Sequence, residues 1–383
     1  IEKIDIGGIA LIRGAAKNFQ DVLIVSSRTQ YDEVFEILSA KNCGTDFEDR
    51  KKYAKLAFGT SSHYDSAIHA YFAGIEDGGN FRASQQTPLR YGENPHQSAS
   101  FYGNLDEMFT QLHGKELSYN NLMDVDACVR LIEEFEDLTY VIVKHNNACG
   151  VATAATSHQA YLNALSCDPI SAFGGVIITN GNVDLATAEE LHKLFFEILI
   201  APSFDADALE ILKKKKDRRL LIKKEVNTSK KQFRTLLNGV LEQDKDLSTE
   251  KTEDFKVVTT RVPTDDQYKA LEFALKICKH LKSNNVVLAK DGQLLASGVG
   301  QTSRVDALKQ AIEKAKEFGF DLNGSVMASE AFFPFPDCVE IAGNVGVTAV
   351  VQPGGSIKDQ LSIDYCNENG IAMVMTGVRH FLH

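Results

Sequence analysis

The segment Tyr140-Val-Ile-Val-Lys-His-Asn-Asn-Ala-Cys-Gly150 decides the fold class, because a run of β-branched residues gives way abruptly to polar ones. Residues 138–143 form an apolar run of strand length, and Lys144 and His145 follow it directly. From about residue 84 onward, such strands alternate with helical patterns, as in layered α/β proteins. The sequence therefore predicts an α/β fold with polar side chains at a strand end.

The same alternation appears twice after residue 84. In the first half we expect a helix at 157–167, capped by Ser157, and a strand at 175–179. The second half has a predicted hairpin across Lys-Asp-Gly, a helix and two later strands, at 285–289 with 293–298, 303–318, 345–351 and 371–375. The two halves are similar only in the order of their predicted strands and helices, but this similarity suggests two related subdomains, at 78–235 and 236–383.

Residues 1–77 read as a short α/β remnant that is too small to close a sheet. It has predicted strands at 1–6 and 21–26 and predicted helices at 9–17, 31–40 and 46–72. A Gly-rich polar segment that begins at Asp77 marks the predicted domain boundary. The chain opens without Met, in what reads as the middle of a strand, so we expect a preceding piece.

Length and charge limit the class of protein. A chain of 383 residues exceeds the usual size of one core, which predicts two or three domain-sized units. The net charge of −11 argues against a nucleic-acid or anionic-membrane partner, because such surfaces attract Lys and Arg. No export signal or membrane span is apparent. Seven scattered cysteines without a Cys-x-x-Cys pair predict reduced thiols, and we expect a cytoplasmic protein.

Four polar clusters lie where open α/β sheets place ligands, at strand ends. They share a high density of charged, amide and glycine residues: 90–97, 144–150, 168–175, and a C-terminal set at 283–285, 300–304, 332–337, 353–356 and 376–379. A lone His is more often structural, yet Lys144, His145 and two amides together are costly to bury without a ligand. Arg304 and Arg379 offer forked donors for phosphate or carboxylate.

Some of these features have a plain structural alternative. Any one Phe of 332–335 serves equally well as an apolar wall, and the basic run at 213–216 is more simply a solvated helix end than a phosphate-steering patch. Motifs for P-loop, dinucleotide and zinc-deaminase chemistry are missing, and no metal site is predicted.

Together the motifs resemble the aminoimidazole carboxamide ribonucleotide transformylase and inosine monophosphate cyclohydrolase family. The resemblance runs along the whole chain and is strongest at LRYGENPHQ, VKHNNACG, DPISAFGG, SGVGQTSR and EAFFPFPD. It implies two cytidine-deaminase-like α/β/α layered subdomains, preceded by a remnant of a methylglyoxal-synthase-like α/β cyclohydrolase domain. It also implies a homodimer with shared active sites.

The implied reaction moves a formyl group from 10-formyltetrahydrofolate to 5-aminoimidazole-4-carboxamide ribonucleotide (AICAR). By resemblance, Lys144 and His145 are the catalytic pair. The implied nucleotide-binding residues are Arg90, Tyr91, Gly174, Glu197, Asn284, Arg304, Phe332 and Arg379. The implied folate-binding residues are Ile170, Phe173, Val305, Pro334, Phe335 and Ser356. Some relatives have Asp in place of Glu197, and others have Asn in place of Cys338.

Asp5 and Lys17 resemble the end of the cyclohydrolase domain, where an Asp and a Lys act in ring closure. Because the preceding part of that domain is not in this sequence, we expect this polypeptide not to close the ring and its full-length parent to do so. Some relatives bind a monovalent cation such as potassium, which the sequence leaves open here. Two other classes stay open at this stage: a deaminase-like hydrolase and a non-catalytic nucleotide-binding protein.

Overall fold

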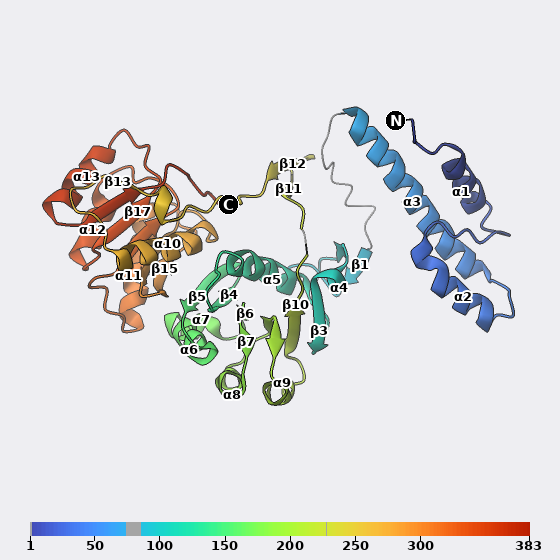
Figure 1. The fold of residues 1–383 in the computed structure, drawn as a ribbon, viewed down its shortest axis with the longest axis horizontal. Helices are drawn as coiled ribbons and strands as arrows, with labels where there is room; N and C mark the ends of the chain where they lie inside the picture. The colour runs from blue at the N-terminus through green and yellow to red at the C-terminus, as the bar shows by residue number, and fades with distance from the viewer. Residues whose placement is uncertain (1, 74–85, 227) are drawn as a thin grey trace. The chain divides into compact units, whose positions relative to one another are not determined.

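A computed structural model describes residues 2–73, 86–226 and 228–383 of the chain (Figure 1). The chain divides into two compact units. The first consists of two segments, the chain up to Pro88 and Ser100–Asn104, and the second comprises Leu89–Ala99 and Leu105–His383. The predicted boundary segment that starts at Asp77 falls largely outside the described residues, so that boundary stays a prediction.

The first unit consists mainly of helices. Its elements before residue 74 are α1 (Gly7–Lys17), the 3-10 helix η1 (Arg28–Gln30), α2 (Tyr31–Ala40) and α3 (Phe47–Ala73). The three predicted helices are therefore confirmed. Small side chains allow α1 and α3 to pack closely, since Ala16, Ala54 and Ala57 form a buried cluster between them.

Both strands predicted in this unit are wrong for the residues that the structure describes. Residues 2–6 form turns and bends, and 21–26 run without strand pairing. The backbone nitrogen of Val22 instead donates to the carbonyl oxygen of Asn18 at 3.0 Å, which closes a turn after α1. An apolar run becomes a strand only where another strand accepts its hydrogen bonds.

The second unit is built on one twelve-stranded sheet. In spatial order its strands are β13 (Lys256–Val257), β18 (Ala372–Met375), β17 (Ala349–Gln352), β16 (Val326–Ser329), β14 (Val286–Lys290), β15 (Gln293–Gly298), β5 (Asn147–Thr153), β4 (Thr139–Lys144), β6 (Val176–Thr179), β8 (Ile198–Ala201), β10 (Arg219–Lys223) and β3 (Phe109–His113). Among the described residues, two two-stranded sheets of the second unit accompany it: β7 (Asn182–Val183) with β9 (Ser203–Phe204), and β11 (Lys231–Leu236) with β12 (Gly239–Asp244). A further two-stranded sheet, β1 (Gln86–Leu89) with β2 (Ala99–Tyr102), consists mostly of residues of the first unit.

The two halves of the large sheet repeat one arrangement. Each has an antiparallel hairpin at the centre, β4–β5 or β14–β15, followed outward by three parallel strands and an antiparallel edge strand. The halves meet where β15 pairs with β5, with Gln293 opposite Ala152. The hairpin predicted across Lys-Asp-Gly is confirmed, with Asp291 and Gly292 both at positive φ as its tight turn requires.

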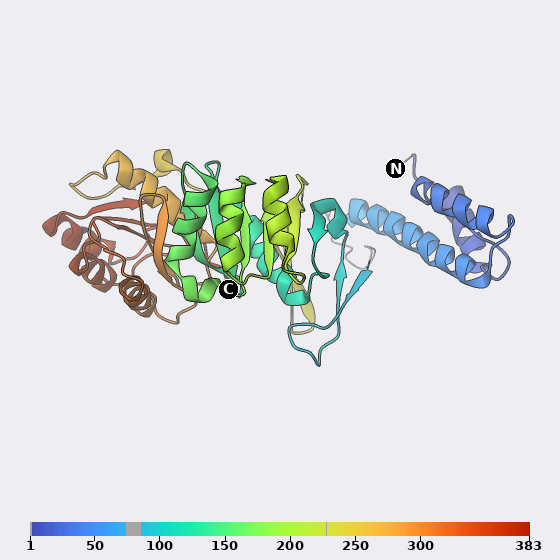
Figure 2. The same cartoon turned by 90° about the horizontal axis from the view of Figure 1, so that it is seen from below.

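Helices cover both faces of this sheet. They are α4 (Leu105–Met108), α5 (Tyr119–Ile132), α6 (Ser157–Cys167), α7 (Pro169–Ala172), α8 (Leu185–Lys193), α9 (Ala206–Lys213), the 3-10 helix η3 (Thr252–Asp254), α10 (Asp265–Lys279), α11 (Arg304–Glu317), α12 (Asp337–Asn344) and α13 (Asp359–Glu368). Figure 2 shows α6, α8 and α9, coloured green to yellow-green, side by side on one face. Because alternate strand residues face opposite ways, Val141 packs toward α5 while Ile142 packs toward α6.

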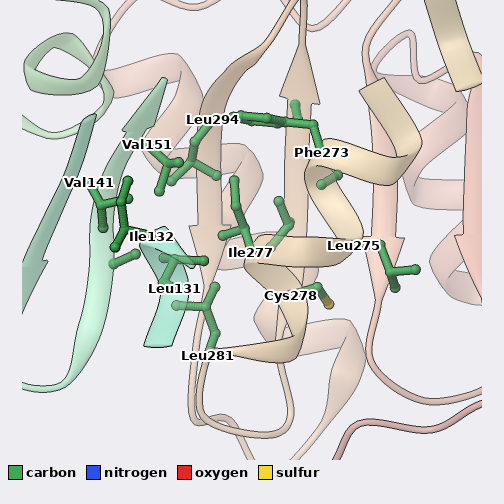
Figure 3. Close-up of a cluster of buried hydrophobic side chains, with 14 of the residues drawn as sticks. Leu131, Ile132, Val141, Val151, Phe273, Leu275, Ile277, Cys278, Leu281 and Leu294 are labelled. Carbon is green, nitrogen blue, oxygen red and sulfur yellow. The ribbon is translucent and has the colours of Figure 1, made fainter. Parts of the chain in front are cut away.

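One hydrophobic core joins the two halves on the other face. Leu131 of α5 and Ile277 of α10 belong to the same buried cluster, together with Val151 of β5 and Leu294 of β15 (Figure 3). Each fully buried Leu or Ile side chain contributes about 1.5–3 kcal/mol, which exceeds the value of an exposed ion pair. Apolar packing therefore holds the halves together.

Most predicted elements of the second unit are confirmed, with small differences at their ends. Thr156, not Ser157, caps α6, because its side chain accepts from the backbone nitrogen of Gln159. The strand predicted at 345–351 begins only at Ala349, since Val345 ends α12. Within the described parts of the chain, no helix is both long and apolar enough to cross a membrane.

Candidate active site

Lys144 and His145 lie on a tight turn between β4 and β5. Lys144 is the last residue of β4, and His145 and Asn146 form the two-residue connection with φ values of 50° and 64°. Two positive φ values define the turn type that matches the twist of a hairpin. The turn leaves His145 exposed and Lys144 half-buried, so both groups can meet a ligand.

Lys144 contacts the glycine-rich loop that the sequence singled out. Its Nζ donates to the carbonyl oxygen of Phe173. The next residue, Gly174, has φ 72°, and a Cβ there would lie 3.2 Å from Lys144 Nζ. The backbone nitrogen of Gly174 donates to Phe195 O at 2.7 Å, and the rings of Phe173 and Phe195 lie 5.1 Å apart. The structure thus brings Lys144, Phe173 and Gly174 together.

Glu197 contacts the cluster of Lys144, Phe173 and Gly174, here the first cluster, through its backbone, and its carboxylate binds neighbouring side chains. Its backbone nitrogen donates to Gly175 O at 3.0 Å, and its Oε2 accepts from Asn121 Nδ2 at 2.6 Å. Arg219 lies 3.7 Å from the same carboxylate oxygen. Burial lowers the pKa of Arg219, the charge of Glu197 opposes that effect, and the nearby charge of Arg90 adds to it. Arg90 is therefore part of the same electrostatic environment.

Arg90 and Tyr91 form a pair at the edge of this cluster. The Arg90 guanidinium lies 4.5 Å from the centre of the Tyr91 ring, and its NH2 donates to Tyr91 Oη at 2.6 Å. Arg90 is exposed, whereas Tyr91 is half-buried. A stacked guanidinium keeps its outward donors free for an anion.

A second cluster surrounds Arg304, the first residue of α11. Arg304 NH1 donates to Glu330 Oε2 at 2.6 Å and NH2 donates to Asn284 Oδ1 at 2.8 Å. Glu330 is fully buried and Arg304 is 8% exposed. Asn284 is held in turn by Gln301, whose carbonyl accepts from the Asn284 side chain at 3.0 Å. Two predicted nucleotide-binding residues, Arg304 and Asn284, are therefore in direct contact.

The remaining predicted ligand-binding residues are mostly exposed. Phe332 is 38% exposed, Phe335 50%, Phe173 58% and Ile170 69%, values that leave apolar surface open. Ile170 of α7 and Phe173 belong to the first half of the second unit, and Phe332 and Phe335 belong to its second half. Lys358 Nζ sits 4.2 Å from the centre of the Phe335 ring, and Ser356 Oγ accepts from the backbone nitrogen of Lys358 at 3.1 Å. Pro334 is exposed and Val305 is half-buried.

Hydrogen bonds connect the two clusters. Asn147, next to the His145 turn, accepts through Oδ1 from the backbone nitrogen of Lys282 at 3.2 Å. Ser283, which precedes Asn284, donates from its backbone nitrogen to Leu382 O at 2.9 Å. The turn that bears Lys144 and His145, the loop that bears Asn284 and the C-terminal segment are thereby neighbours. Arg379 lies on that segment, exposed, with its guanidinium 4.3 Å from the centre of the Phe381 ring.

A half-buried carboxylate, Glu134, joins the end of α10 to the segment that links the halves. Glu134 accepts from Thr249 Oγ1 at 2.6 Å and Lys279 Nζ at 2.7 Å, and its Oε1 lies 2.7 Å from His280 Nε2. Burial alone would raise the pKa of Glu134, but these three hydrogen bonds outweigh burial and lower it to about 2. Glu134 is therefore ionised near neutral pH.

The C-terminal segment is anchored by a buried imidazole. His380 is 2% exposed, and its two ring nitrogens lie 2.6 Å from Asp246 Oδ2 and 2.8 Å from Glu250 Oε2. Burial favours the neutral ring, yet the two carboxylates outweigh it and raise the pKa of His380. Because Arg379 precedes His380, this anchor also fixes the backbone of a predicted nucleotide-binding residue.

The structure does not bring Asp5 and Lys17 together. Asp5 Oδ1 accepts from the backbone nitrogen of Gly8 at 2.9 Å, so it lies at the start of α1, whereas Lys17 is the exposed last residue of that helix. A helix of this length separates its ends by roughly 16 Å.

Sequence reasoning missed the residues that hold the predicted ones in place. Asn121, Asp124 and Glu330 are all buried or half-buried and each contacts a predicted site residue or its turn. Asn121 and Asp124 could have been found by their spacing, since they are polar residues three apart on an otherwise apolar helix face, and Glu330 is the first residue of the EAFFPFPD motif.

Comparison with known proteins identifies the class of this α/β protein with its paired polar clusters. The chain belongs to the AICARFT/IMPCHase bienzyme family, whose model matches residues 15–314. A protein of Bacteroides thetaiotaomicron named bifunctional purine biosynthesis protein PurH is 62% identical over 385 residues, covering 100% of this chain and 76% of that protein.

More distant relatives carry the same name. The protein of Persephonella marina is 46% identical over 403 residues, and that of Caldicellulosiruptor saccharolyticus is 45% identical over 400 residues. In both cases the match covers 100% of this chain and 77% of the relative. The family resemblance predicted from the motifs is confirmed.

Proposed function

We propose that this chain transfers the formyl group of 10-formyltetrahydrofolate to AICAR, with Lys144 and His145 as the catalytic pair. The observation that carries the proposal is the hydrogen bond that the backbone nitrogen of Lys282 donates to Asn147, because it joins the Lys144–His145 turn to the loop of Asn284. Membership of a purine-biosynthesis family agrees with a nucleotide substrate. Neither a deaminase-like hydrolase nor a non-catalytic binding protein is favoured by these relatives.

The reaction needs positioning above all, because an aromatic amine is a weak nucleophile. Its nitrogen attacks the formyl carbon and loses a proton to the general base, the bond from that carbon to the folate nitrogen breaks, and the leaving folate nitrogen gains a proton. Holding the partners in place supplies about 7–11 kcal/mol of the barrier. General-base help from His145 adds about 10²–10⁴ in rate.

Lys144 is suited to stabilise the charge that develops on the formyl oxygen. Its ammonium group has three donors, and one of them points to the carbonyl oxygen of Phe173. The hydrogen bond to Phe173 O holds Lys144 Nζ in place. Another N–H of the same ammonium group is then already oriented to donate to the oxyanion. Gly174 leaves space for this arrangement, because any Cβ there would crowd Nζ.

The remaining predicted residues complete the proposed site. Arg90, Tyr91, Gly174, Glu197, Asn284, Arg304, Phe332 and Arg379 would bind the ribonucleotide, and Ile170, Phe173, Val305, Pro334, Phe335 and Ser356 would bind the folate. The proposal includes a first part at 1–77 and two deaminase-like subdomains, at 78–235 and 236–383, in a cytoplasmic homodimer. Binding of a monovalent cation such as potassium is tested separately, by comparing urea midpoints in potassium and in an organic cation.

The test of the catalytic pair is formyl transfer by His145→Ala, followed by the absorbance of the folate product. We expect turnover to fall by about 10²–10⁴ while AICAR binding, measured by calorimetry, is retained. Transfer at the wild-type rate would remove His145 from the mechanism. Loss of AICAR binding along with turnover would instead make His145 a binding residue.

Shared active sites in a homodimer have their own test. Lys144→Ala and Arg379→Ala chains are each expected to be inactive, and both changes lie at exposed or half-buried side chains. If the two residues serve one site from different subunits, mixing the inactive chains restores part of the activity. Activity that stays absent in verified mixed dimers would contradict sharing.

A further inference from the structure

Helix α5 presents two polar side chains toward the candidate active site. Asn121 and Asp124 are three residues apart and share one helix face. Asn121 Nδ2 donates to Glu197 Oε2 at 2.6 Å, and Asp124 Oδ1 accepts from the backbone nitrogen of Asn146 at 2.6 Å. One helix face therefore contacts both a predicted nucleotide-binding residue and the turn that carries His145.

The His145 turn needs an anchor of this kind. Both of its central residues have positive φ, a conformation that residues with a Cβ adopt rarely and keep only where the surroundings hold them. With its side-chain nitrogen turned toward α5, Asn146 also donates to Asp124 Oδ1 at 3.3 Å and to Met123 O at 3.1 Å. Asp124 thus holds both the backbone and the side chain of Asn146.

The imidazole of His145 also affects the pKa of the Asp124 carboxylate. Burial raises the pKa of Asp124 above its ordinary value, while the hydrogen bond from Asn146 and the proximity of His145 act in the opposite direction. Half-buried carboxylates that accept backbone hydrogen bonds form short, directional contacts. Such a contact is stiff enough to set the orientation of the residue next to it.

We propose that Asp124 is a positioning residue for His145, fixing the His145–Asn146 turn through the Asn146 N–H so that the imidazole stays beside the reacting amine. This inference rests on the proposed function. Asp124 does not touch the substrate in this account, so it acts on turnover and not on nucleotide affinity. A purely structural role would instead change stability and leave turnover per folded molecule intact.

The test compares three variants of the full chain. Asp124→Ala removes the acceptor, and Asp124→Asn keeps an oxygen that accepts from Asn146. Asp126→Ala is the matched control, because Asp126 lies two residues further along α5 and pairs with Arg130 at 3.1 Å, with its side chain 66% exposed. Each protein is assayed for formyl transfer, AICAR binding and amide hydrogen exchange.

We expect kcat of Asp124→Ala to fall at least about tenfold, AICAR affinity to stay within about threefold, and Asp124→Asn to recover most of the activity. Exchange at the Asn146 amide should be slow in the wild type and in Asp124→Asn, and fast in Asp124→Ala. Asp126→Ala should match the wild type in every measurement. If melting curves show that Asp124→Ala fails to fold, Asp124→Ser takes its place with the same expected fall in kcat, because its shorter side chain leaves the Asn146 N–H without the carboxylate acceptor.

The outcomes separate this inference from the proposed function. If the wild type transfers formyl groups and Asp124→Ala matches Asp126→Ala in kcat, only the positioning role is overturned. Unchanged exchange at Asn146 in Asp124→Ala overturns it as well. A wild-type chain without formyl transfer overturns both the proposed function and the role of Asp124 in it.

Discussion

Replacing Glu330 by Gln should destabilise the second unit strongly, because it leaves a buried guanidinium without its counter-charge. Glu330 has no exposed surface, its Oε2 lies 2.6 Å from Arg304 NH1, and it also accepts from the backbone nitrogen of Asn285 at 3.3 Å. Removing one partner of a buried ion pair typically costs about 3–5 kcal/mol, which is a large share of the stability of a domain.

Urea unfolding followed by circular dichroism measures this loss, since the chain has no Trp for fluorescence. Asp217→Asn is the control, because its pair with Lys115 is exposed on both sides and should matter little. The double variant Arg304→Met with Glu330→Leu should regain most of the stability, since apolar residues often replace a buried pair without loss. It should also bind AICAR poorly.

A loss below about 1 kcal/mol for Glu330→Gln would refute the reasoning, because it would mean that the Arg304 charge is not buried as the structure shows. Recovery of stability together with full AICAR affinity in the double variant would refute the binding role of Arg304 separately.

Three further substitutions, at Gly174, Glu134 and His380, test the candidate site and the pH dependence of stability. Gly174→Ala should lower formyl transfer more than Gly319→Ala, because both positions have positive φ but only the first Cβ would approach Lys144 Nζ; equal losses would point to backbone strain alone. The pKa of Glu134 is lowered, so its stabilisation is complete above about pH 4.5 and lost as pH falls toward about 2. The urea-midpoint difference between wild type and Glu134→Gln should shrink over that range, and a constant difference would contradict it. The pKa of His380 is raised, so its stabilisation is present below pH 6.5 and lost as pH rises above that value. The difference from His380→Gln should therefore shrink between pH 6 and pH 9, and growth of that difference would contradict the sign.

Local sequence signals predicted the parts of the fold that depend on neighbouring residues. The Asp291-Gly292 turn and the start of α11 after Ser303 follow from turn and capping preferences alone. The strand expected at 21–26 failed because strand formation depends on a partner strand, which local sequence does not reveal.

For the candidate site, too, the sequence predicted the features that depend on neighbouring residues but not the contacts between distant ones. Lys144 and His145 stood out as polar residues after an apolar strand, but the tight turn did not, because His-Asn is not the usual pair for two positive φ values. Asp124 and Glu330 were missed because their contacts lie 22 and 26 residues away along the chain, a distance at which only the folded structure joins them.

The most direct test of the account is the mass of AICAR after incubation of the purified wild-type chain with 10-formyltetrahydrofolate. Transfer predicts a nucleotide heavier by one carbon and one oxygen, formed in step with the loss of formyl-folate. Unchanged AICAR, with the folate either intact or simply hydrolysed, would contradict the central claim.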